Sequence, residues 1–457
     1  MRVPLVPPTI PFLRRAGSDL DPVMLERMLR LALSGIGPTP TGRYLHWDQL
    51  RHRPAPPGMT AEDFWNATKV ARISLYRPIG LVDTTGSPFR FANVPLLAEH
   101  LHHVDRDASG TLRTPAQVTD PATRDRYLIS SLHEEAITSS QLEGASTTRD
   151  AAKQMLREGR APANHSERMI VNNYAAMEWL RSLADEPLSP AIVFELHRIL
   201  TADTFDDSRD AGRFRLDSDE IVVSDETGRV LHRPPVADEL ATRMEKMCAF
   251  ASEGDADGGF LHPVVRSILL HFWLAYDHPF VDGNGRVARA LFYWSMARHG
   301  YWLCEYVSIS RILRRARAQY LRSFLYCETD DNDLTYFLVD QLRVLNRAID
   351  DLHSYLARKS DQIRQAERDV RLAWKTRLVL NERQLALLAH ALRTPNASYT
   401  LGSHRNSHGI AYETARKDLQ SLVEDRLLSQ HKRGRRFVFI PSANLLERVA
   451  RLSRARS

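Results

Sequence analysis

The residues best suited to chemistry lie in one stretch, from position 278 to 289, which reads His-Pro-Phe-Val-Asp-Gly-Asn-Gly-Arg-Val-Ala-Arg. Glycine permits backbone angles that let N–H groups close on an anion, and a helix is expected to begin directly after the glycines. Arg286 and Arg289 are three positions apart, so on that helix they share a face and are both expected to turn toward the anion. The pattern predicts a phosphate nest formed by Gly283, Asn284 and Gly285.

Two further side chains in the stretch supply a base and a metal ligand. His278 is expected to titrate near neutrality and to take a proton from an attacking hydroxyl. Asp282 offers the hard carboxylate oxygen that Mg²⁺ prefers when it is shared with phosphate oxygens. Each residue alone is common in helix caps, turns and solvated faces, whereas their combination favours a polyphosphate site. The stretch is not a P-loop, because no Gly-Lys-Ser/Thr follows the glycines.

The stretch resembles the signature of the Fic family, His-x-Phe-x-Asp/Glu-Gly-Asn-Gly-Arg-x-x-Arg, and it matches at every specified position. Members of this family typically transfer AMP from ATP to a hydroxyl side chain of a target protein. The resemblance therefore implies ATP and Mg²⁺ as cofactors and a protein as substrate. It makes His278 the base, Asp282 the Mg²⁺ ligand, Phe280 a core anchor, and Gly283, Asn284 and Gly285 the nest, with Arg286 beside the β-phosphate and Arg289 near the γ-phosphate.

A second resemblance lies upstream, in Ser139-Ser140-Gln141-Leu142-Glu143-Gly144. By itself this segment is typical of a polar helix end that is stopped by glycine. It is similar to the inhibitory motif Ser/Thr-x-x-x-Glu-Gly/Asn of many Fic proteins, which begins here at Ser139 and implies an ion pair between Glu143 and Arg289. An arginine held by a carboxylate cannot hold a γ-phosphate. In some relatives the same glutamate positions water for AMP removal, so a hydrolytic activity stays open.

A β-hairpin is predicted between these two motifs. Residues 220–224 and 229–232 flank a loop of turn-forming residues, Asp225 to Gly228. Read structurally, the segment is only a small hairpin. In Fic proteins a comparable flap holds the target segment as an added strand, and main-chain pairing of that kind would align a hydroxyl. The resemblance places target docking on Ile221, Val222 and Val223.

The elements that must position the signature are helical. Residues 189–200 form a well-patterned helix capped by Ser189, in which His197 is expected to be packed or exposed and not a ligand. The helix that opens at residues 260–263 is apolar nearly all round and is expected to be buried. The resemblance covers about residues 125–345, and it implies a mainly α fold with a Fic-type helical core and a small β-hairpin flap.

The chain has 457 residues, 43% of them hydrophobic, which is enough for two or three domains. The three cysteines are widely spaced and odd in number, so they indicate reduced thiols and a cytoplasmic location. The prolines near the start argue against a signal peptide, and no apolar run approaches the ~18 residues of a membrane span. We expect no membrane partner, and a homodimer is possible.

The carboxy-terminal part has a basic character. Residues 429–457 hold eight basic residues and one acidic residue, a local balance of 8 − 1 = +7 against +6 for the whole chain. Three predicted helices followed by two strands resemble a winged helix-turn-helix domain. Its possible DNA contacts are Thr414, Arg416, Lys417, Lys432, Arg433, Arg435 and Arg436. The alternative is that this domain docks on the core or binds protein, with a merely solvated basic face.

We therefore predict four parts: a partly helical N-terminal region at 1–120, a Fic core with its inhibitory helix at 121–346, a connecting helix at 347–379 and a winged-helix domain at 380–457. The predicted function is AMP transfer from MgATP, restrained by Glu143. Two alternatives remain. The donor could be another nucleotide such as a UMP source, or the protein could be a DNA-binding regulator whose Fic fold senses nucleotide. The intact His278 favours an enzyme, because a pure sensor needs no base.

Overall fold

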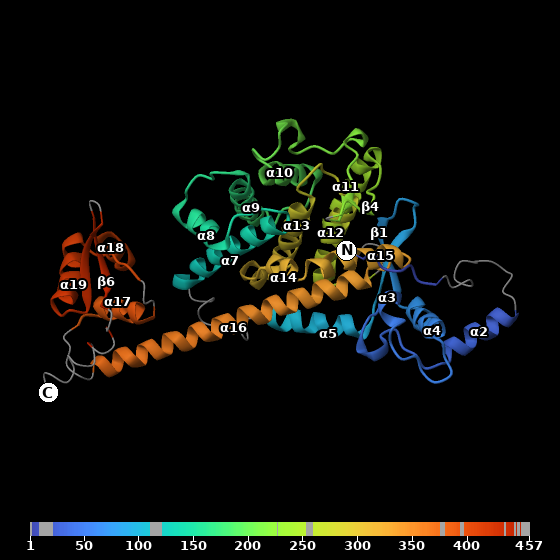
Figure 1. Ribbon diagram of the computed structural model, residues 1–457, viewed down its shortest axis with the longest axis horizontal. Coiled ribbons are helices and arrows are strands. Elements are labelled where there is room, and N and C mark those ends of the chain that lie inside the picture. Colours follow the sequence, from blue (N-terminus) through green and yellow to red (C-terminus); the bar gives the residue numbers. More distant parts are fainter. Residues whose placement is uncertain are drawn as a thin grey trace. The chain divides into compact units, whose positions relative to one another are not determined.

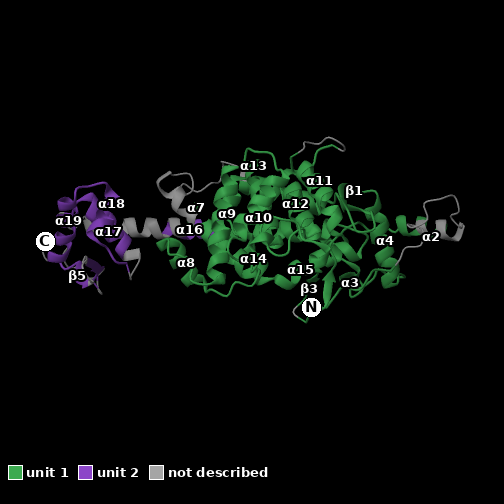
Figure 2. Cartoon of the chain, turned by 90° about the horizontal axis from the view of Figure 1, so that it is seen from above, with its two compact units in different colours: residues 1–352 green, residues 353–457 purple. Residues whose placement is uncertain are grey.

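The computed structural model describes residues 2–8, 22–109, 121–225, 227–252, 259–374, 380–393, 397–433 and 436–442, together with 445 and 448. The chain divides into two compact units, residues 1–352 and 353–457 (Figure 2). Among the described residues, helices dominate both units, and the strands form three separate two-stranded antiparallel sheets. The prediction of a mainly α protein is confirmed.

Two consecutive helices form the centre of unit 1, α12 (Pro263–Asp277) and α13 (Asn284–Arg298) (Figure 1). They pack against each other, and nearly every residue of both is buried, as expected for a helix that is apolar all round. Three further helices pack around this pair: α7 (Pro121–Leu142), α9 (His165–Ser182) and α10 (Pro190–Leu200). The segment that joins α12 to α13 is the signature, so its ends are fixed by the most buried part of the fold.

Local capping explains where these helices begin. The His262 imidazole accepts a hydrogen bond from the Val264 N–H at the start of α12, where Pro263 occupies the first turn. Ser189 caps α10 in the same way, again with proline directly after it. Thr148 caps α8 (Arg149–Glu158), which packs on α7. The capped start that the sequence predicts at Ser189 is therefore present, and α12 begins within the range expected for its start.

The described residues of the N-terminal region form the helices α2 (Pro22–Ala32), α3 (Trp47–Leu50), α4 (Ala61–Ile73) and α5 (Pro95–Val104), and a hairpin of β1 (Tyr76–Val82) and β2 (Pro88–Ala92). A capping box begins α4, because Thr60 Oγ1 accepts from the Asp63 N–H and the Asp63 carboxylate accepts from the Thr60 N–H. A turn before residue 89 joins the two paired strands.

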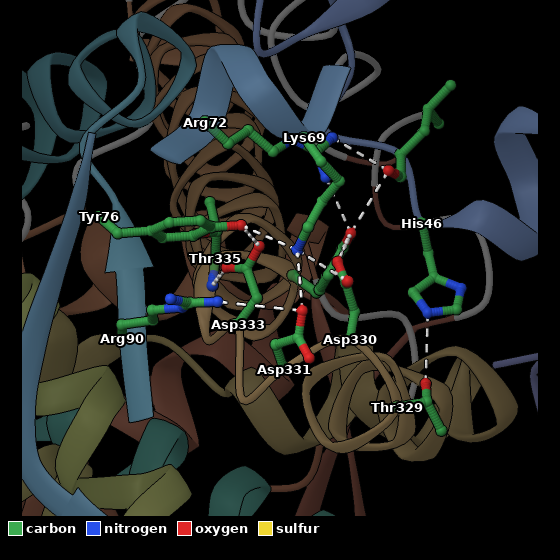
Figure 3. Close-up of polar contacts among 12 residues, drawn as sticks. His46, Lys69, Arg72, Tyr76, Arg90, Thr329, Asp330, Asp331, Asp333 and Thr335 are labelled. Carbon is green, nitrogen blue, oxygen red and sulfur yellow. Dashed lines mark hydrogen bonds and ion pairs between the residues drawn. The ribbon is translucent and has the colours of Figure 1, made fainter. Parts of the chain in front are cut away.

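A buried polar cluster joins this region to the rest of unit 1 (Figure 3). Lys69 of α4 forms a 2.8 Å ion pair with Asp330, and both side chains are almost fully buried. Asp333 accepts hydrogen bonds from the hydroxyls of Tyr44, at 2.6 Å, and Tyr76, at 2.8 Å. Since a buried charge is costly without its partner, these contacts make the segment from Tyr44 to Tyr76 an integral part of the unit.

Unit 1 also contains α11 (Leu240–Ser252), α14 (Ile309–Arg315), α15 (Arg317–Thr329) and the first part of α16 (Thr335–Trp374), with the short strands β3 (Val223–Ser224) and β4 (Val230–His232). The helical run between α14 and α15 is broken at Ala316, which has non-helical backbone angles. The connecting helix predicted to begin at 347 is not a separate helix: α16 is continuous from Thr335, because no glycine or proline interrupts the pattern.

Unit 2 contains the end of α16, then α17 (Glu382–Arg393), α18 (Leu401–His408) and α19 (Tyr412–Glu424), followed by β5 (Leu428–Arg433) and β6 (Arg436–Pro441). Its core gathers leucines from the helices with Phe439 of β6. The Asp418 carboxylate ties the helices together, since it accepts from Arg383 and lies 3.1 Å from His404 Nε2. The predicted order of three helices and a hairpin is present. None of the helices in the described parts of the chain is long and apolar enough to cross a membrane.

Candidate active site

His278 ends α12 in a left-handed conformation with φ 46°, and its N–H still closes the helix on the Leu274 carbonyl. Its Nδ1 lies 3.4 Å from the Ala275 carbonyl oxygen, which can only accept, so Nδ1 carries the hydrogen and Nε2 keeps its lone pair. Burial lowers the pKa of His278 to about 4. The expectation that it titrates near neutrality is therefore wrong, because the partly enclosed imidazole resists charge. At pH 7 it is a neutral acceptor.

Two side chains of the signature hold the loop that follows His278. Phe280 is fully buried, and its ring stacks on that of His197 at 3.8 Å between centroids, as expected of a core anchor. Asn284 is also buried: its Oδ1 accepts from the Phe280 N–H at 2.9 Å and its Nδ2 donates to the Phe280 carbonyl at 2.8 Å. Both polar atoms of the Asn284 side chain are thus used to hold the loop. Only the backbone N–H of Asn284 remains available to bind an anion in a nest.

His197 is a second loop support whose role the sequence did not reveal. Its Nδ1 accepts from the Gly212 N–H at 2.9 Å, so Nε2 carries the hydrogen that is donated to the Asp282 carbonyl at 2.8 Å. Burial lowers its pKa to about 4, which keeps this pair of bonds intact at neutral pH. Its position on the buried face of α10 was predictable. Its hydrogen-bond partners were not, because they lie far away in the chain.

Gly283 begins α13 with φ 84°, a conformation that other residues rarely adopt. A Cβ at this position would also lie 3.1 Å from Thr201 Cγ2 and 3.4 Å from the His197 ring. The glycine is therefore required both by the backbone angle and by the close approach of α10. This explains why the turn into α13 carries glycine here.

The two arginines of the signature differ in their partners. Arg286 is fully buried and donates to the Leu200 carbonyl at 3.0 Å and to Asp282 Oδ2 at 2.9 Å. Arg289 is equally buried and faces α7. Among the described residues, Arg286 Nε and Arg289 Nη1 are buried donors without a hydrogen-bond partner. Unpaired buried donors are rare and costly, and here they are what an anion would satisfy.

Glu143 occupies the position that the phosphate nest would offer to an anion. Its Oε1 lies 2.8 Å from Arg289 Nη2, while Arg289 Nε donates to Ser139 Oγ at 2.9 Å. A Cβ built on Gly285 would lie 2.2 Å from Glu143 Oε1 and 3.0 Å from Arg289 Nη1. The carboxylate therefore rests against the glycine at the amino end of α13, where the helix dipole favours negative charge. The predicted ion pair is present.

Glu135 fixes the helix that leads to Glu143. The spacing of four places Glu135 and Ser139 on one face of α7, and Glu143 lies in the turn directly after Leu142, the last residue of the helix. The buried Glu135 carboxylate accepts from Ser308 Oγ at 2.7 Å and from the Ser310 N–H at 3.2 Å, at the start of α14. Burial raises the pKa of Glu135. The role of Glu135 was not predicted from the sequence.

Asp282 fits the expectation of a single carboxylate for Mg²⁺. Its side chain is 62% exposed, although Oδ2 accepts from Arg286. The described part of the chain brings together no group of three or more His, Cys, Asp or Glu side chains suited to a metal ion. A magnesium ion at Asp282 would therefore depend on phosphate oxygens and water for its other ligands, which is how Mg²⁺ is commonly bound in phosphoryl-transfer sites.

The predicted hairpin is shorter than expected. Strand β3 contains only Val223 and Ser224, so Ile221 and Val222 precede it, and Val223 pairs with His232 of β4. The reason is local: a 3-10 turn at Asp217–Asp219 and a left-handed Glu220, with φ 48°, delay the start of extended pairing. Glu226 of the loop lies outside the described residues. Val222 is exposed and therefore accessible to a partner strand.

The candidate DNA-binding residues lie on α19 and the hairpin of unit 2. Arg416 and Lys417 are exposed near the start of α19, and Thr414 is half-buried. Lys432 is exposed on β5, and the backbone of Arg433 pairs with that of Arg436 in the strand register. Arg435 lies outside the described residues. Within α19, Arg416 approaches Glu413 only loosely, at 3.9 Å.

Comparisons with known proteins agree with this geometry. Residues 187–296 match the model of the Fic/DOC family, a range that includes the whole signature. The chain is 27% identical over 183 residues to a protein adenylyltransferase Fic of Nematostella vectensis, covering 39% of this chain and 40% of that one. It is 27% identical over 198 residues to a protein adenylyltransferase Fic of Drosophila virilis, covering 43% of this chain and 38% of that one.

The chain thus spans about two fifths of the length of these curated relatives. A solved Fic family protein from Desulfovibrio desulfuricans G20 superposes with a TM-score of 0.50 at 17% identity, covering 78% of this chain and 98% of that one. At that identity the likeness concerns the fold alone. Over most of the chain the helical architecture is therefore similar to that of this solved protein.

Proposed function

We propose that this protein transfers AMP from ATP to a hydroxyl side chain of a target protein, and that Glu143 restrains the reaction. The observation that carries the proposal is the position of the Glu143 carboxylate, against Gly285 and paired with Arg289, in the same site as the neutral His278. A negatively charged group already rests where the amino end of α13 and two unpaired arginine donors would receive phosphate.

In the proposed reaction the target hydroxyl oxygen forms a bond to the α-phosphorus and the bond to the departing pyrophosphate breaks. The hydroxyl proton passes to Nε2 of His278, whose lone pair is available because Nδ1 carries the hydrogen. The amino end of α13 and the arginine donors would stabilise the charge on the phosphates. Asp282 would hold Mg²⁺, which neutralises phosphate charge when bound.

The proposed restraint has a direct electrostatic basis. Arg289 cannot hold a terminal phosphate while its Nη2 is engaged by Glu143 and its Nε by Ser139. The carboxylate also repels a phosphate at the Gly285 cradle, because like charges a few ångströms apart in a buried site are poorly screened. We therefore expect ATP to bind weakly, or in an unproductive position, while this ion pair persists.

The experiment that tests the proposal compares the parent with Glu143→Gly during incubation with α-labelled ATP and Mg²⁺ in cell lysate. We expect Glu143→Gly to increase label on itself or on target proteins, and the double variant Glu143→Gly/His278→Ala to remove it. Equal labelling by the parent and by Glu143→Gly would contradict the restraint. Labelling that persists without His278 would contradict its role as base.

The contacts of Arg286, Arg289 and Gly285 would select for phosphates and not for a particular nucleobase, so the donor nucleotide has to be identified by experiment. Parallel incubations with α-labelled UTP, GTP and CTP would identify the preferred donor. Release of AMP from purified labelled protein by the parent, and not by Glu143→Gly, would favour the hydrolytic alternative. Nucleotide binding without any transfer or release would favour the nucleotide-sensing regulator.

We propose a second function for unit 2, as a winged helix-turn-helix domain that binds DNA. Support comes from the succession of α17, α18, α19 and a two-stranded hairpin, and from exposed Arg416 and Lys417 near the start of α19, where a recognition helix contacts DNA. We expect the full chain to shift duplex DNA at low salt and to lose binding steeply as salt rises. Arg416→Ala/Lys417→Ala should weaken the shift. Absence of binding at low salt would overturn this proposal.

We also propose a reducing compartment such as the cytoplasm. Cys248, Cys304 and Cys327 are all buried free thiols. Burial raises the pKa of Cys248 to about 12, so this thiol is a poor thiolate former. Thiols of this kind need no oxidising environment.

A further inference from the structure

Both ends of the hairpin segment next to the active site contact the same feature, the backbone carbonyls at the carboxy terminus of α12. The last turn of a helix leaves several carbonyl groups without an intrahelical partner. In α12 those groups belong to the residues directly before and after His278, the proposed base. Side chains from both ends of the segment 215–232, which contains β3 and β4, donate to them.

Arg215 supplies the contacts at the first end. Its Nε donates to the His278 carbonyl at 2.8 Å, its Nη2 lies 3.5 Å from the Asp277 carbonyl, and its backbone N–H donates to the Pro279 carbonyl at 2.9 Å. Nη2 also donates to the carbonyl of Pro235, just beyond β4. The side chain is buried. One guanidinium thus connects the catalytic loop with both edges of the hairpin segment.

His232 supplies the contact at the second end. Its Nε2 lies 2.8 Å from the Tyr276 carbonyl oxygen, and its Nδ1 lies 2.8 Å from Glu328 Oε2 of α15. Both partners can only accept, apart from a protonated carboxyl, so both ring nitrogens donate and the imidazole is positively charged. Burial disfavours this charge, but the hydrogen bond to Glu328, the charges of Glu328 and Asp277, and the hydrogen bond to the Tyr276 carbonyl together outweigh burial and raise the pKa of His232.

Together the two cationic side chains contact the carbonyls of residues 276 to 278, and the backbone N–H of Arg215 adds the carbonyl of Pro279. The Ala275 carbonyl faces His278 Nδ1, so the carbonyls around the base are all directed to defined partners. Positive charge at a helix carboxy terminus is favoured by the helix dipole. The left-handed backbone of His278 is therefore held by residues of the hairpin segment as well as by its own helix.

We propose that Arg215 and His232 form a clamp that fixes the β3–β4 hairpin to the carboxy terminus of α12 and so positions both the base and the strand that would receive a target. The structural half of this inference, the anchoring, stands on the contacts above. The catalytic half rests on the proposed AMP transfer. Arg215 and His232 are positioning residues in this account, because they act through the backbone of α12 and through β4.

The clamp has a pH dependence that a purely apolar anchor lacks. The groups that face His232 are the carboxylates of Glu328 and Asp277, the hydroxyl of Tyr276, the imidazole of His278, and Arg243, which pairs with Asp277. Because the folded pKa of His232 is raised, the clamp is complete below pH 6.5 and is lost as pH rises through the folded value. Deprotonation removes one of its two donors.

The anchoring is tested by amide hydrogen exchange in the full chain at one pH. We expect Arg215→Lys and His232→Gln each to accelerate exchange of the amides in residues 223–232 by about tenfold or more, as expected for loss of a charged hydrogen bond. Arg213→Ala is the matched control, because Arg213 contacts Asp210, Phe214 and Asp219 and not α12. Unchanged exchange in both variants, or equal acceleration by the control, would overturn the clamp.

The catalytic half is tested by the rate of auto-modification with α-labelled ATP in the Glu143→Gly background. We expect Arg215→Lys to lower the rate about tenfold to hundredfold without weakening the binding of a fluorescent ATP analogue, since a misplaced base costs rate and not phosphate affinity. The rate should fall as His232 deprotonates above pH 6.5, and His232→Gln should abolish that fall. A pH limb that persists in His232→Gln contradicts the assignment.

Failure of the proposed function would be recognised separately. If Glu143→Gly incorporates no label under any condition, AMP transfer is wrong, and the exchange measurement still decides whether the hairpin is anchored. If Glu143→Gly is active and Arg215→Lys matches it in rate, the hairpin is anchored for another purpose and the positioning role is wrong. Thermal unfolding of each variant separates these outcomes from general loss of structure.

Discussion

Glu143 Oε1 lies 2.8 Å from Arg289 Nη2, although 146 positions of sequence, 289 − 143, separate the two residues. The arginine is fully buried and the glutamate is partly accessible, so the pair closes the site from its exposed side. The same carboxylate lies against Gly285. A site that would bind a phosphate tail therefore already contains an anion of its own chain, and the proposed transfer would require that anion to be displaced.

Gly285→Ala should impair nucleotide binding more than stability. The added methyl group would fall within 2.2 Å of Glu143 Oε1 and 3.0 Å of Arg289 Nη1, so it fills the cradle that a phosphate would use. We expect at least a tenfold weaker affinity for a fluorescent ATP analogue, measured in the Glu143→Gly background. Gly402→Ala is the control, since its methyl group would meet only Thr400 Oγ1 at 3.8 Å. Equal affinity in both variants would remove Gly285 from the nest.

Glu135→Gln should loosen α7. The carboxylate accepts from Ser308 Oγ and the Ser310 N–H at Oε2 and from the Ser310 hydroxyl at Oε1, so an amide nitrogen at either position replaces an acceptor by a donor, and α7 loses a buried contact at a cost of about 1–3 kcal/mol. We expect basal auto-modification to rise and the urea midpoint to fall. In the Glu143→Gly background the same change should give no further rise. An additive gain in the double variant would show that Glu135 acts independently of Glu143.

Asn284→Ala should lower the transfer rate through the loop and not through phosphate contacts. The variant leaves the Phe280 N–H and carbonyl without partners in a buried place, which costs about 1–3 kcal/mol for each group. We expect a lower rate at saturating ATP with little change in ATP affinity, measured by titration of the labelling reaction. Asn346→Ala, which loses a bond to the His100 carbonyl away from the site, should keep the parent rate.

Stability should fall as pH decreases from 6.5 to 4. Burial lowers the pKa of His46 to about 4 and that of His271 to about 3, so the unfolded chain binds more protons than the folded chain in this window. Each pKa unit corresponds to about 1.4 kcal/mol, which sets an upper limit of roughly 3 kcal/mol for His46. Urea unfolding at a series of pH values measures the effect, and His46→Gln should reduce it. A constant urea midpoint would contradict the prediction.

Much of the site was predictable because its residues are neighbours in the chain. Spacing alone predicted the turn into a helix at Gly283, and the resemblance to a known signature added the pairing of Glu143 with Arg289, which the structure contains. The capping box at Thr60 and the capped start of α10 were equally readable, since such contacts span only a few residues.

The predictions that were wrong concern properties that depend on burial and on contacts between residues far apart in the sequence. His278 was expected to titrate near neutrality, but its surroundings lower its pKa to about 4. Strand β3 was expected to include Ile221 and Val222, but the turn before Glu220 shortens it. The separate helices expected on either side of position 346 are one, because a helical pattern does not reveal where a helix passes from one compact unit into the next.

The sequence by itself determined the local chemistry: which residues could act as base, metal ligand and phosphate donors, and where helices begin. Only the tertiary structure decided which distant groups complete that chemistry. His197 and Arg215 donate to backbone carbonyls of the signature itself, His232 donates to the Tyr276 carbonyl just before it, and Glu135 joins α7 to the start of α14. Such partners leave no periodic pattern, because a hydrogen bond across the fold depends on packing and not on spacing along the chain.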